Sequence, residues 1–303
     1  MNYIEEVKKI KREKNAIVLA HSYQNVEIDE VADYVGDSLF LSQKAKETDA
    51  DIIVFAGVYF MAQTAKILNP DKKVILPHDI KAGCDMADMI DLQQLRLFKN
   101  KYPGIPVVCY INSTAEVKSE CDICCTSSNA VDIVASLGAE KVLFVPDQNL
   151  GRWVEKQLGN VEVITYNGYC PIHNNFEPSE IFKTRQKYPK AVVLAHPECR
   201  EIFLDGADYV GSTTGIMNYV RNSNLSEFII ATEQGVVDRL KRDFANKKFY
   251  NISDKPSFCE SMKLNTIEDI YKALVDELPE IQVEEEIAKK AVKCIDRMLE
   301  VSK

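Results

Sequence analysis

The sequence predicts an α/β fold in which three homologous αβα sandwich domains, each with a four-stranded parallel sheet, are arranged with pseudo-threefold symmetry around a central site. Two observations lead to this prediction. Short, almost wholly apolar segments alternate with charged amphipathic ones, which is typical of parallel strands covered by helices on both faces. The same order of segments also occurs three times, and an internal repeat of this kind fixes the architecture.

The repeat is defined by three apolar segments that end at His21, Tyr110 and His196. Sixteen residues after each end comes a pair of polar residues suited to cap a helix, namely Asp37-Ser38, Thr126-Ser127 and Ser212-Thr213. Thirty-six residues after each end a further apolar segment closes, at Gly57, Pro146 and Thr232. Roughly 60 residues after each end comes a cysteine, and the three are Cys84, Cys170 and Cys259. Residues at equal positions in the repeats should therefore occupy equivalent places in three similar domains.

This spacing divides the 303-residue chain into four parts. We expect αβα domains over residues 1–88, 89–174 and 175–262, each near the lower end of the usual domain size. Residues 263–303 hold two further helical segments, over 266–278 and 284–301, without another strand. We expect both helices to pack on the outside and to close the assembly against the first repeat.

Each repeat begins with a charged amphipathic helix, expected over residues 4–14, 92–102 and 179–188. A Lys-Tyr-Pro sequence ends this helix in the second and third repeats, because the residue before a proline disfavours helix. Four strands follow in each repeat, with helices between them. They are expected over residues 17–21, 34–36, 52–55 and 73–76, then 107–110, 123–125, 142–145 and 161–164, then 192–196, 209–211, 228–230 and 248–250.

Composition excludes several classes of function. The formal net charge is −9 and the basic residues are scattered, so the chain lacks the electrostatic footprint of a nucleic-acid-binding protein. The N-terminal segment is charged rather than signal-like, and no apolar segment is long enough to span a bilayer. Nine cysteines, an odd number, without an export signal favour reduced thiols. We expect a cytoplasmic protein with small-molecule substrates and no nucleic-acid or membrane partner.

The polar residues of the repeat are predicted to meet at one place. In parallel sheets, ligands gather at the carboxyl ends of the strands. The residues that end the first strands, and those two positions later, lie there: His21, Tyr23, Tyr110, Asn112, His196 and Glu198. The capping pairs open helices, whose N-termini bind anions. One such pair is most often an ordinary cap, but three in register favour a site for a ligand with several negative groups.

The three equivalent cysteines indicate a metal centre. One cysteine from each of three repeats can converge only near the pseudo-threefold axis. Zinc held by three cysteines is one reading. The other is an iron–sulfur cluster, which normally takes four cysteines when it transfers electrons. Three cysteines leave one iron free to act as a Lewis acid on a substrate oxygen, which suits a dehydration.

The remaining cysteines are interpreted as structural. Cys109 and Cys124 occupy apolar positions of the repeat, and Cys125 matches a glycine at a strand end. The run from Cys121 to Cys125 resembles half of a zinc or redox motif whose other half is missing. Cys294 lies on the last predicted helix. Cys199, beside Glu198, and His78 have no counterparts in the repeat. The role of Cys199 stays open, and His78 is expected at the surface.

Eight short motifs, spread from about residue 15 to about residue 265, resemble those of the quinolinate synthase family of NAD biosynthesis. They are Leu19-Ala20-His21-Ser22-Tyr23-Gln24, Val35-Gly36-Asp37-Ser38, Tyr110-Ile111-Asn112-Ser113-Thr114, Thr126-Ser127-Ser128-Asn129-Ala130, Pro146-Asp147-Gln148-Asn149-Leu150-Gly151, Cys170-Pro171-Ile172-His173, His196-Pro197-Glu198-Cys199 and Gly211-Ser212-Thr213. The chain departs from the family at Ser22, where many members have Asn, and at the extra threonine Thr214. Both departures concern only fine substrate contacts.

The resemblance implies an activity and a cofactor. Members of this family arrange three αβα domains around a 4Fe–4S cluster held by three cysteines, here Cys84, Cys170 and Cys259. They condense iminoaspartate with dihydroxyacetone phosphate to quinolinate, releasing phosphate and water. Coupling to an aspartate-oxidising enzyme that supplies unstable iminoaspartate is an open expectation.

The resemblance and the repeat together suggest roles for the other residues. Glu198 and Tyr23 are candidates for proton transfer. His21, Tyr110 and His196 are further candidates for catalysis and for binding anionic oxygens, with structural histidines as the alternative. Tyr110, Asn112 and His173 are expected to make neutral contacts to the substrate, such as to a carboxylate or to the imine. The anions are expected to bind at the helix starts with Ser38, Ser127, Ser212 and Thr213. The phosphate is expected at Ser212-Thr213 and the two carboxylates near Ser38 and Ser127.

Three alternatives remain from the sequence alone. Diphthamide-synthesis radical enzymes and hydroxymethylbutenyl diphosphate reductase share the three-repeat, three-cysteine plan, although the motifs above disfavour them. An iron–sulfur sensor would carry an additional DNA-binding or docking module, for which the sequence has no candidate segment. A structural zinc protein would be colourless.

Overall fold

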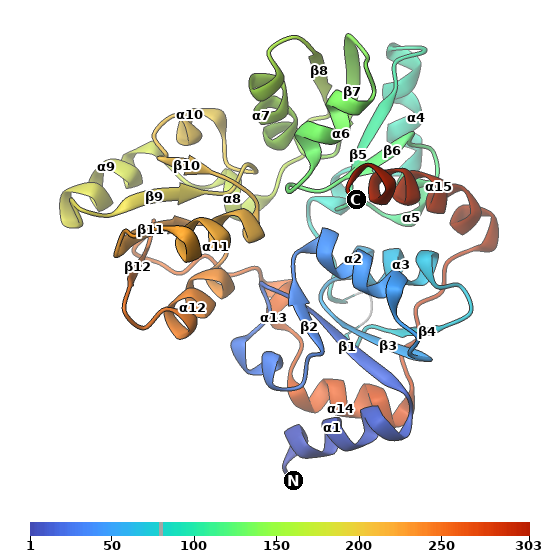
Figure 1. Cartoon of the computed structure of the whole chain (residues 1–303). Coiled ribbons are helices and arrows are strands. Elements are labelled where there is room, and N and C mark those ends of the chain that lie inside the picture. The colour runs from blue at the N-terminus through green and yellow to red at the C-terminus, as the bar shows by residue number, and fades with distance from the viewer. Residues whose placement is uncertain (79–80) are drawn as a thin grey trace.

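The computed structural model describes residues 1–78 and 81–303 and contains three separate sheets, each covered by helices (Figure 1). The strand orders are β2-β1-β3-β4, β6-β5-β7-β8 and β10-β9-β11-β12, and every paired strand in these sheets is parallel to its neighbour. In each repeat the first strand therefore lies between the second and the third. The predicted fold class, three αβα sandwiches with four-stranded parallel sheets, is confirmed.

The first repeat provides the sandwich at the bottom of Figure 1. Its elements are α1 (Tyr3–Glu13), β1 (Ala16–His21), the 3-10 helix η1 (Val26–Glu30), β2 (Tyr34–Gly36), α2 (Ser38–Glu47), β3 (Ile52–Ala56), α3 (Tyr59–Leu68) and β4 (Lys73–Ile75). Strand β3 is buried along its whole length, as expected for a central strand covered on both faces.

The second and third repeats follow the same order. The second contains η3 (Ala87–Met89), α4 (Leu92–Lys101), β5 (Val107–Tyr110), α5 (Ala115–Lys118), β6 (Ile123–Cys125), α6 (Ala130–Ser136), β7 (Lys141–Val145), α7 (Gln148–Leu158), β8 (Glu162–Thr165) and α8 (Pro171–Asn174). The third contains α9 (Pro178–Lys187), β9 (Val192–Ala195), α10 (Glu201–Leu204), β10 (Tyr209–Val210), α11 (Thr213–Asn222), β11 (Glu227–Ala231), α12 (Gln234–Asp243), β12 (Lys248–Asn251) and α13 (Glu260–Lys263).

One hydrogen bond occurs identically in all three repeats. The Oδ2 atoms of Asp33, Asp122 and Asp208, just before the second strand, accept from the backbone N–H of Val18, Val107 and Val193 on the first strand, each at 2.7 Å. The aspartate thereby fixes the connection between the two strands. Each aspartate lies twelve residues after the end of its first apolar segment, so the repeat in the sequence and the repeat in the structure coincide.

The two C-terminal helices pack on different parts of the molecule. Helix α14 (Ile267–Asp276) lies on α1 and contacts β3, which agrees with the expectation that it closes against the first repeat (Figure 1). Helix α15 (Glu285–Val301) instead packs mainly on β6 and α5 of the second repeat and also on α3 of the first. The expected contact of α15 with the first repeat is thus made through α3, and its buried residues Ile295 and Met298 belong to an apolar core shared by the first and second repeats.

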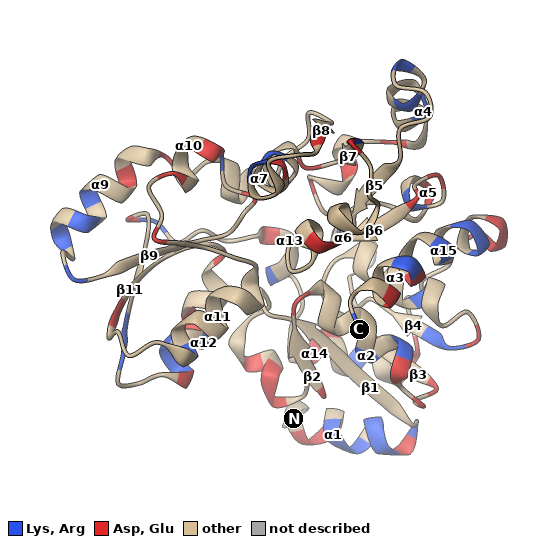
Figure 2. Cartoon of the chain, turned by 45° about the horizontal axis from the view of Figure 1, so that its top comes forward, with Lys and Arg blue, Asp and Glu red and all other residues tan. Residues whose placement is uncertain are grey.

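Charged residues lie mainly on the outer helices. Figure 2 shows basic and acidic residues interspersed on α1 and α15, in keeping with the scattered basic residues of the sequence. Within residues 1–78 and 81–303, no helix combines the length and the apolar character needed to cross a membrane.

Candidate active site

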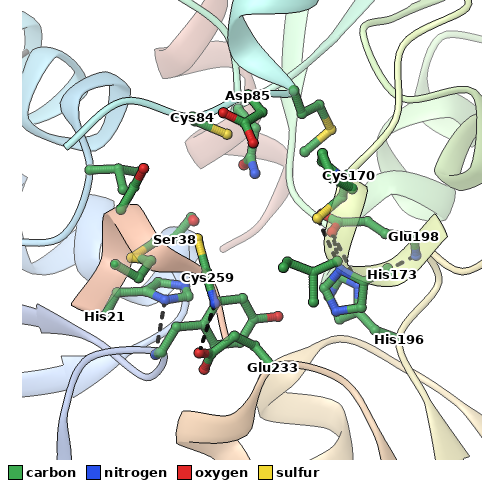
Figure 3. A pocket seen from close by; sticks show the side chains of 18 of the residues that line it. His21, Ser38, Cys84, Asp85, Cys170, His173, His196, Glu198, Glu233 and Cys259 are labelled. Atoms are coloured by element: carbon green, nitrogen blue, oxygen red, sulfur yellow. Dashed lines mark hydrogen bonds and ion pairs between the residues drawn. The ribbon is translucent and has the colours of Figure 1, made fainter. Parts of the chain in front are cut away.

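The carboxyl ends of the three sheets face one cavity of about 310 Å³ (Figure 3). Its walls come from all three repeats. His21 ends β1, Tyr110 ends β5 and His196 directly follows β9, so the three equivalent residues reach the cavity from three directions. The strand ends of a parallel sheet are where ligands are expected.

All but one of the residues predicted for the site line this cavity: His21, Tyr23, Ser38, Cys84, Tyr110, Asn112, Ser127, Cys170, His173, His196, Glu198, Thr213 and Cys259. The exception is Ser212. Its Oγ accepts a hydrogen bond from the backbone N–H of Gly215 at 3.1 Å, so Ser212 is the N-cap of α11 and its hydroxyl is already used. Of the pair expected to hold a phosphate, Thr213 is the member that faces the cavity.

Glu198 carries a buried carboxylate that contacts Tyr110, His173 and His196. Its Oε1 accepts a hydrogen bond from the hydroxyl of Tyr110, and its Oε2 lies 2.7 Å from Nδ1 of His173 and 3.7 Å from Nδ1 of His196. Burial by itself would raise the pKa of Glu198, but the neighbouring His196 and His173 and the Tyr110 hydroxyl hold that pKa below its usual range. The carboxylate is therefore ionised.

The two histidines that end first strands are neutral near pH 7. Burial lowers the pKa of His21 to about 4 and that of His196 to about 3. In each ring Nδ1 accepts from the backbone N–H two residues later, that of Tyr23 at 3.2 Å or that of Glu198 at 3.4 Å. A neutral imidazole that accepts at Nδ1 carries its proton on Nε2. Both histidines can thus donate a hydrogen bond from Nε2 without carrying a positive charge.

Tyr23 belongs to a chain of hydroxyl contacts. Its hydroxyl accepts from Thr213 Oγ1 at 3.1 Å and lies 3.2 Å from Thr232 Oγ1, which in turn lies 2.9 Å from Nε2 of His173. Burial raises the pKa of Tyr23 well above its usual value, so the hydroxyl keeps its proton. Thr232 closes an apolar segment of the third repeat. The equivalent residues of the other repeats, Gly57 and Pro146, carry no hydroxyl, so the repeat gave no reason to assign Thr232 to the site.

The three equivalent cysteines differ from the buried ones by their exposure to the cavity. Cys84, Cys170 and Cys259 are partly exposed and line it from three loops (Figure 3). Burial raises the pKa of the Cys84 thiol to about 12 and that of Cys259 to about 11. Three thiolates therefore require a bound cation here, since metal binding is what removes protons from such thiols.

The spacing of the donors does not suit a single ion held by the three cysteines. The one close group of metal-binding atoms that residues 1–78 and 81–303 form is Cys170, His173 and Glu198, within 4.8 Å of one another. Cys84 and Cys259 stand outside this group, on other sides of the cavity (Figure 3). A single zinc ion draws its ligands to within a little over about 2 Å. Among the described residues, the three cysteines therefore do not form a preformed site for a single ion.

The cavity offers neutral donors to an anion. Acidic residues also line it, namely Asp37, Asp85, Glu198, Glu233 and Glu260. None of the described residues that line it is Lys or Arg. Ser38 and Thr213 are the first residues of α2 and α11, where free backbone N–H groups meet the positive end of the helix dipole. In the part of the chain that the structure describes, Asn112 Oδ1 is buried without a hydrogen-bond partner, so it can accept a hydrogen bond from a ligand.

The other cysteines lie outside the cavity. Cys109, Cys124, Cys125, Cys199 and Cys294 are buried, and Cys121 is partly exposed. Cys124 Sγ lies 3.2 Å from Cys294 Sγ, where α15 packs on β6. Cys199, left open from the sequence, does not reach the cavity.

His78 is not a free surface residue. Its Nε2 lies 3.1 Å from Asp269 Oδ2, so the imidazole contacts α14. The expectation of a surface position is therefore corrected to a half-buried contact with the C-terminal segment.

A buried arginine and a partly buried lysine position the loop of Tyr23, and sequence reasoning missed them. The Arg239 guanidinium donates to the carbonyls of Ser22 and Gln24, both at 2.8 Å, and Lys263 Nζ donates to the carbonyl of Tyr23. Lys263 also lies 3.2 Å from Glu233 Oε1, which accepts from the backbone N–H of Cys259 at 3.3 Å. Arg239 and Lys263 have no counterparts in the other repeats, so the repeat could not reveal them, whereas Glu233 matches Asp147 of the second repeat and could have been found by alignment.

Comparison with known proteins agrees with this site. A family model described as quinolinate synthetase A protein matches residues 5–300. The chain is 52% identical over 301 residues to the quinolinate synthase of Alkaliphilus metalliredigens, covering 99% of this chain and 98% of that protein. It is 46% identical over 296 residues to that of Thermodesulfovibrio yellowstonii (98% and 97% covered) and 45% over 293 residues to that of Clostridioides difficile (97% and 96%).

The match spans all three repeats and both C-terminal helices, and the identity is high over nearly the whole length of each relative. The chain therefore belongs to the quinolinate synthase family.

Proposed function

We propose that this chain is the enzyme that condenses iminoaspartate with dihydroxyacetone phosphate to quinolinate, phosphate and two molecules of water. The observation that carries the proposal is the convergence of Cys84, Cys170 and Cys259, one from each repeat, on one cavity that also holds the strand-end polar residues of all three repeats. Family membership supports the same reaction. Iminoaspartate carries two carboxylates and the second substrate a phosphate, so the ligands bring three anionic groups.

We further propose that these three cysteines hold a 4Fe–4S cluster. With three protein ligands, the fourth iron would be an open Lewis acid that assists departure of a substrate hydroxyl. The cysteine thiols, with pKa values raised by burial, would be deprotonated on binding the cluster.

Anion binding would rely on Ser38, Ser127 and Thr213, since no lysine or arginine among the described residues lines the cavity. The hydroxyl and backbone N–H groups at the starts of α2 and α11 would take the phosphate and a carboxylate, with the phosphate at Thr213. The Nε2–H groups of His21 and His196 would donate to further carboxylate oxygens. The unpaired Asn112 Oδ1 would accept from the imine nitrogen of iminoaspartate.

Proton transfer would be shared between an ionised and a neutral group. Joining the two substrates removes a proton from carbon, and each loss of water requires a proton on the departing oxygen. Glu198, ionised and hydrogen-bonded to Tyr110, would accept the first proton. Tyr23, which keeps its proton, would supply one to a departing oxygen and recover it through Thr213 or Thr232.

The test is direct product formation. Protein purified and reconstituted with iron and sulfide under anaerobic conditions should be brown, should lose this colour in air, and should form quinolinate from the two substrates, as measured by liquid chromatography with mass detection. Cluster-free protein should form none. A brown protein that produces no quinolinate would refute the proposed reaction, and a colourless active protein would refute the proposed cofactor.

One wider expectation, about the supply of substrate, accompanies the activity. Iminoaspartate hydrolyses readily, so we propose functional coupling to an aspartate-oxidising enzyme in the cytoplasm. If coupling exists, a mixture of the two enzymes should form more quinolinate from aspartate than the same enzymes separated by a membrane that passes small molecules. Equal yields would exclude it.

A further inference from the structure

One carboxylate oxygen in the wall of the cavity joins all three repeats. Asp37 Oδ2 accepts a hydrogen bond from Ser128 Oγ of the second repeat and from Thr214 Oγ1 of the third, both at 2.7 Å. Its Oδ1 accepts from the backbone N–H of Phe40 at 3.0 Å, as the N-cap of α2. Asp37 is 7% exposed, and residues 1–78 and 81–303 form no ion pair with it. The hydrogen-bond donors to this carboxyl group are thus all neutral, and each one satisfies a largely buried acceptor.

The neighbours of these three residues are the hydroxyl groups that face the cavity. Ser38 directly follows Asp37, Ser127 directly precedes Ser128, and Thr213 directly precedes Thr214, and all three neighbours line the cavity. Each pair is joined by one rigid peptide unit. A displacement of Ser128 or Thr214 away from Asp37 would therefore displace Ser127 or Thr213 relative to Ser38.

The repeat shows that this contact depends on differences between the repeats. Ser38, Ser127 and Thr213 hold the same position in the repeat. One position earlier, the first repeat alone has a carboxylate, where the others have Thr126 and Ser212. One position later, the second and third repeats have Ser128 and Thr214, whereas the first has Leu39. The acceptor and its two donors therefore complement one another across the pseudo-threefold axis.

We propose that Asp37 is a positioning residue that sets the spacing of Ser38, Ser127 and Thr213, and thereby the affinity of the site for its anionic ligands. This inference rests on the proposed function. The structure assigns Thr214 a purpose as well: the residue that departs from the family pattern supplies the hydroxyl of the third repeat. Asp37 touches no reacting atom in this proposal and acts only through the hydroxyls beside it.

The test compares hydroxyl removal with hydroxyl retention. In the cluster-loaded enzyme, Thr214→Val should weaken the binding of dihydroxyacetone phosphate and Ser128→Ala that of quinolinate, each by about tenfold, as measured by anaerobic titration calorimetry. Thr214→Ser keeps the hydroxyl and should restore binding to within about twofold of the parent. KM should rise while kcat changes little, because the reacting groups are untouched. Thr184→Val is the matched control, since Thr184 Oγ1 bonds the carbonyl of Ile252 far from the cavity.

A double-mutant cycle decides whether Asp37 is the shared acceptor. With Asp37→Ala as background, Thr214→Val should weaken binding no further, because its partner is already gone. Independent, additive effects, or wild-type binding by Thr214→Val, would overturn the proposal. Thermal unfolding of each variant identifies any that fails to fold, and Thr214→Ser then provides the comparison.

The design separates the two proposals. A parent enzyme that neither binds nor forms quinolinate would refute the proposed function. A parent that does both, together with a Thr214→Val variant that binds normally, would refute only the role of Asp37.

Discussion

Glu198 Oε2 lies 2.7 Å from Nδ1 of His173, and the two residues belong to different repeats. Helix α8, which carries His173, begins directly after Cys170, whereas Glu198 follows β9 of the third repeat. The carboxylate that we propose as proton acceptor is thus held by an imidazole attached to a cysteine-bearing loop. Placement of that cysteine and placement of the base are therefore coupled through one short contact.

Replacing Glu198 by Gln should stop the reaction while leaving the cluster in place. Glutamine keeps the shape and an oxygen for the Tyr110 hydroxyl, but it cannot take up a proton. Loss of a general base typically costs about 100-fold or more in rate. Quinolinate formation should fall accordingly, with unchanged iron content and visible spectrum. Turnover near that of the parent would remove Glu198 from the proposed acid–base role.

Removing any one of the three cavity cysteines should abolish both cluster and activity. Cys84→Ala, Cys170→Ala and Cys259→Ala each take away one ligand from a different repeat. Cys124→Ser is the matched control, because Cys124 is buried at the contact of β6 with α15 and does not line the cavity. Iron and sulfide analysis with the visible spectrum measures the outcome. A full cluster in an alanine variant, or its loss in Cys124→Ser, would mean that other thiols are the ligands.

The buried histidines predict that the cluster-free protein loses stability as the pH falls. The pKa values of His21 and His196 are about 4 and about 3 in the folded protein, against about 6.5 in an unfolded chain. Between these values the unfolded chain binds more protons, so the free energy of unfolding rises with pH. The full stabilisation is present above about pH 6.5 and is lost as the pH falls toward the folded pKa values.

Denaturant unfolding of the cluster-free protein at several pH values measures this effect. His21→Gln cannot take up the proton and should flatten the decline between about pH 6.5 and about pH 4. A decline as steep as that of the parent would show that His21 is not buried in its neutral form.

The sequence sufficed for features that the repeat encodes position by position. The meeting of the three cysteines and of the strand-end residues His21, Tyr110 and His196 at one cavity follows from aligning the copies, because equivalent residues in similar domains occupy equivalent places. The four-stranded parallel sheets were predicted as well, but their strand order was not. The aspartates before the second strands, Asp33 and its two counterparts, obey the same rule and could have been found in this way.

Contacts that do not occur in all three repeats could not be predicted by aligning the repeats. Alignment shows which residues are equivalent, but not which atoms meet across the axis, because that depends on how the domains pack. The contacts of Asp37 with Ser128 and of Tyr110 with Glu198 are of this kind. Arg239, a fully buried cation, carries no periodic signal at all. Apolar periodicity predicted helix α15 itself, but periodicity does not specify which domain will cover an apolar face.

The two members of the pair at the start of α11 should respond differently to substitution. Ser212→Ala removes the helix cap and should cost about 1 kcal/mol in the free energy of unfolding. Thr213→Val removes a hydroxyl that faces the cavity and hydrogen-bonds Tyr23, and should raise KM for dihydroxyacetone phosphate by about tenfold. Denaturant curves and initial rates measure the two effects. A larger rise in KM from Ser212→Ala than from Thr213→Val would reverse the assignment.

The position of α15 predicts that the C-terminal helix is part of the core rather than a cover for the first repeat. Met298 is fully buried and packs in the apolar core that includes β5 and β6. Met298→Ala should therefore lower the free energy of unfolding by about 2–5 kcal/mol, through lost burial and the cavity left behind. Lys289→Ala on the exposed face of the same helix is the control and should change it by less than about 0.5 kcal/mol. Similar, small effects of both substitutions would mean that α15 can detach without disturbing the second sandwich.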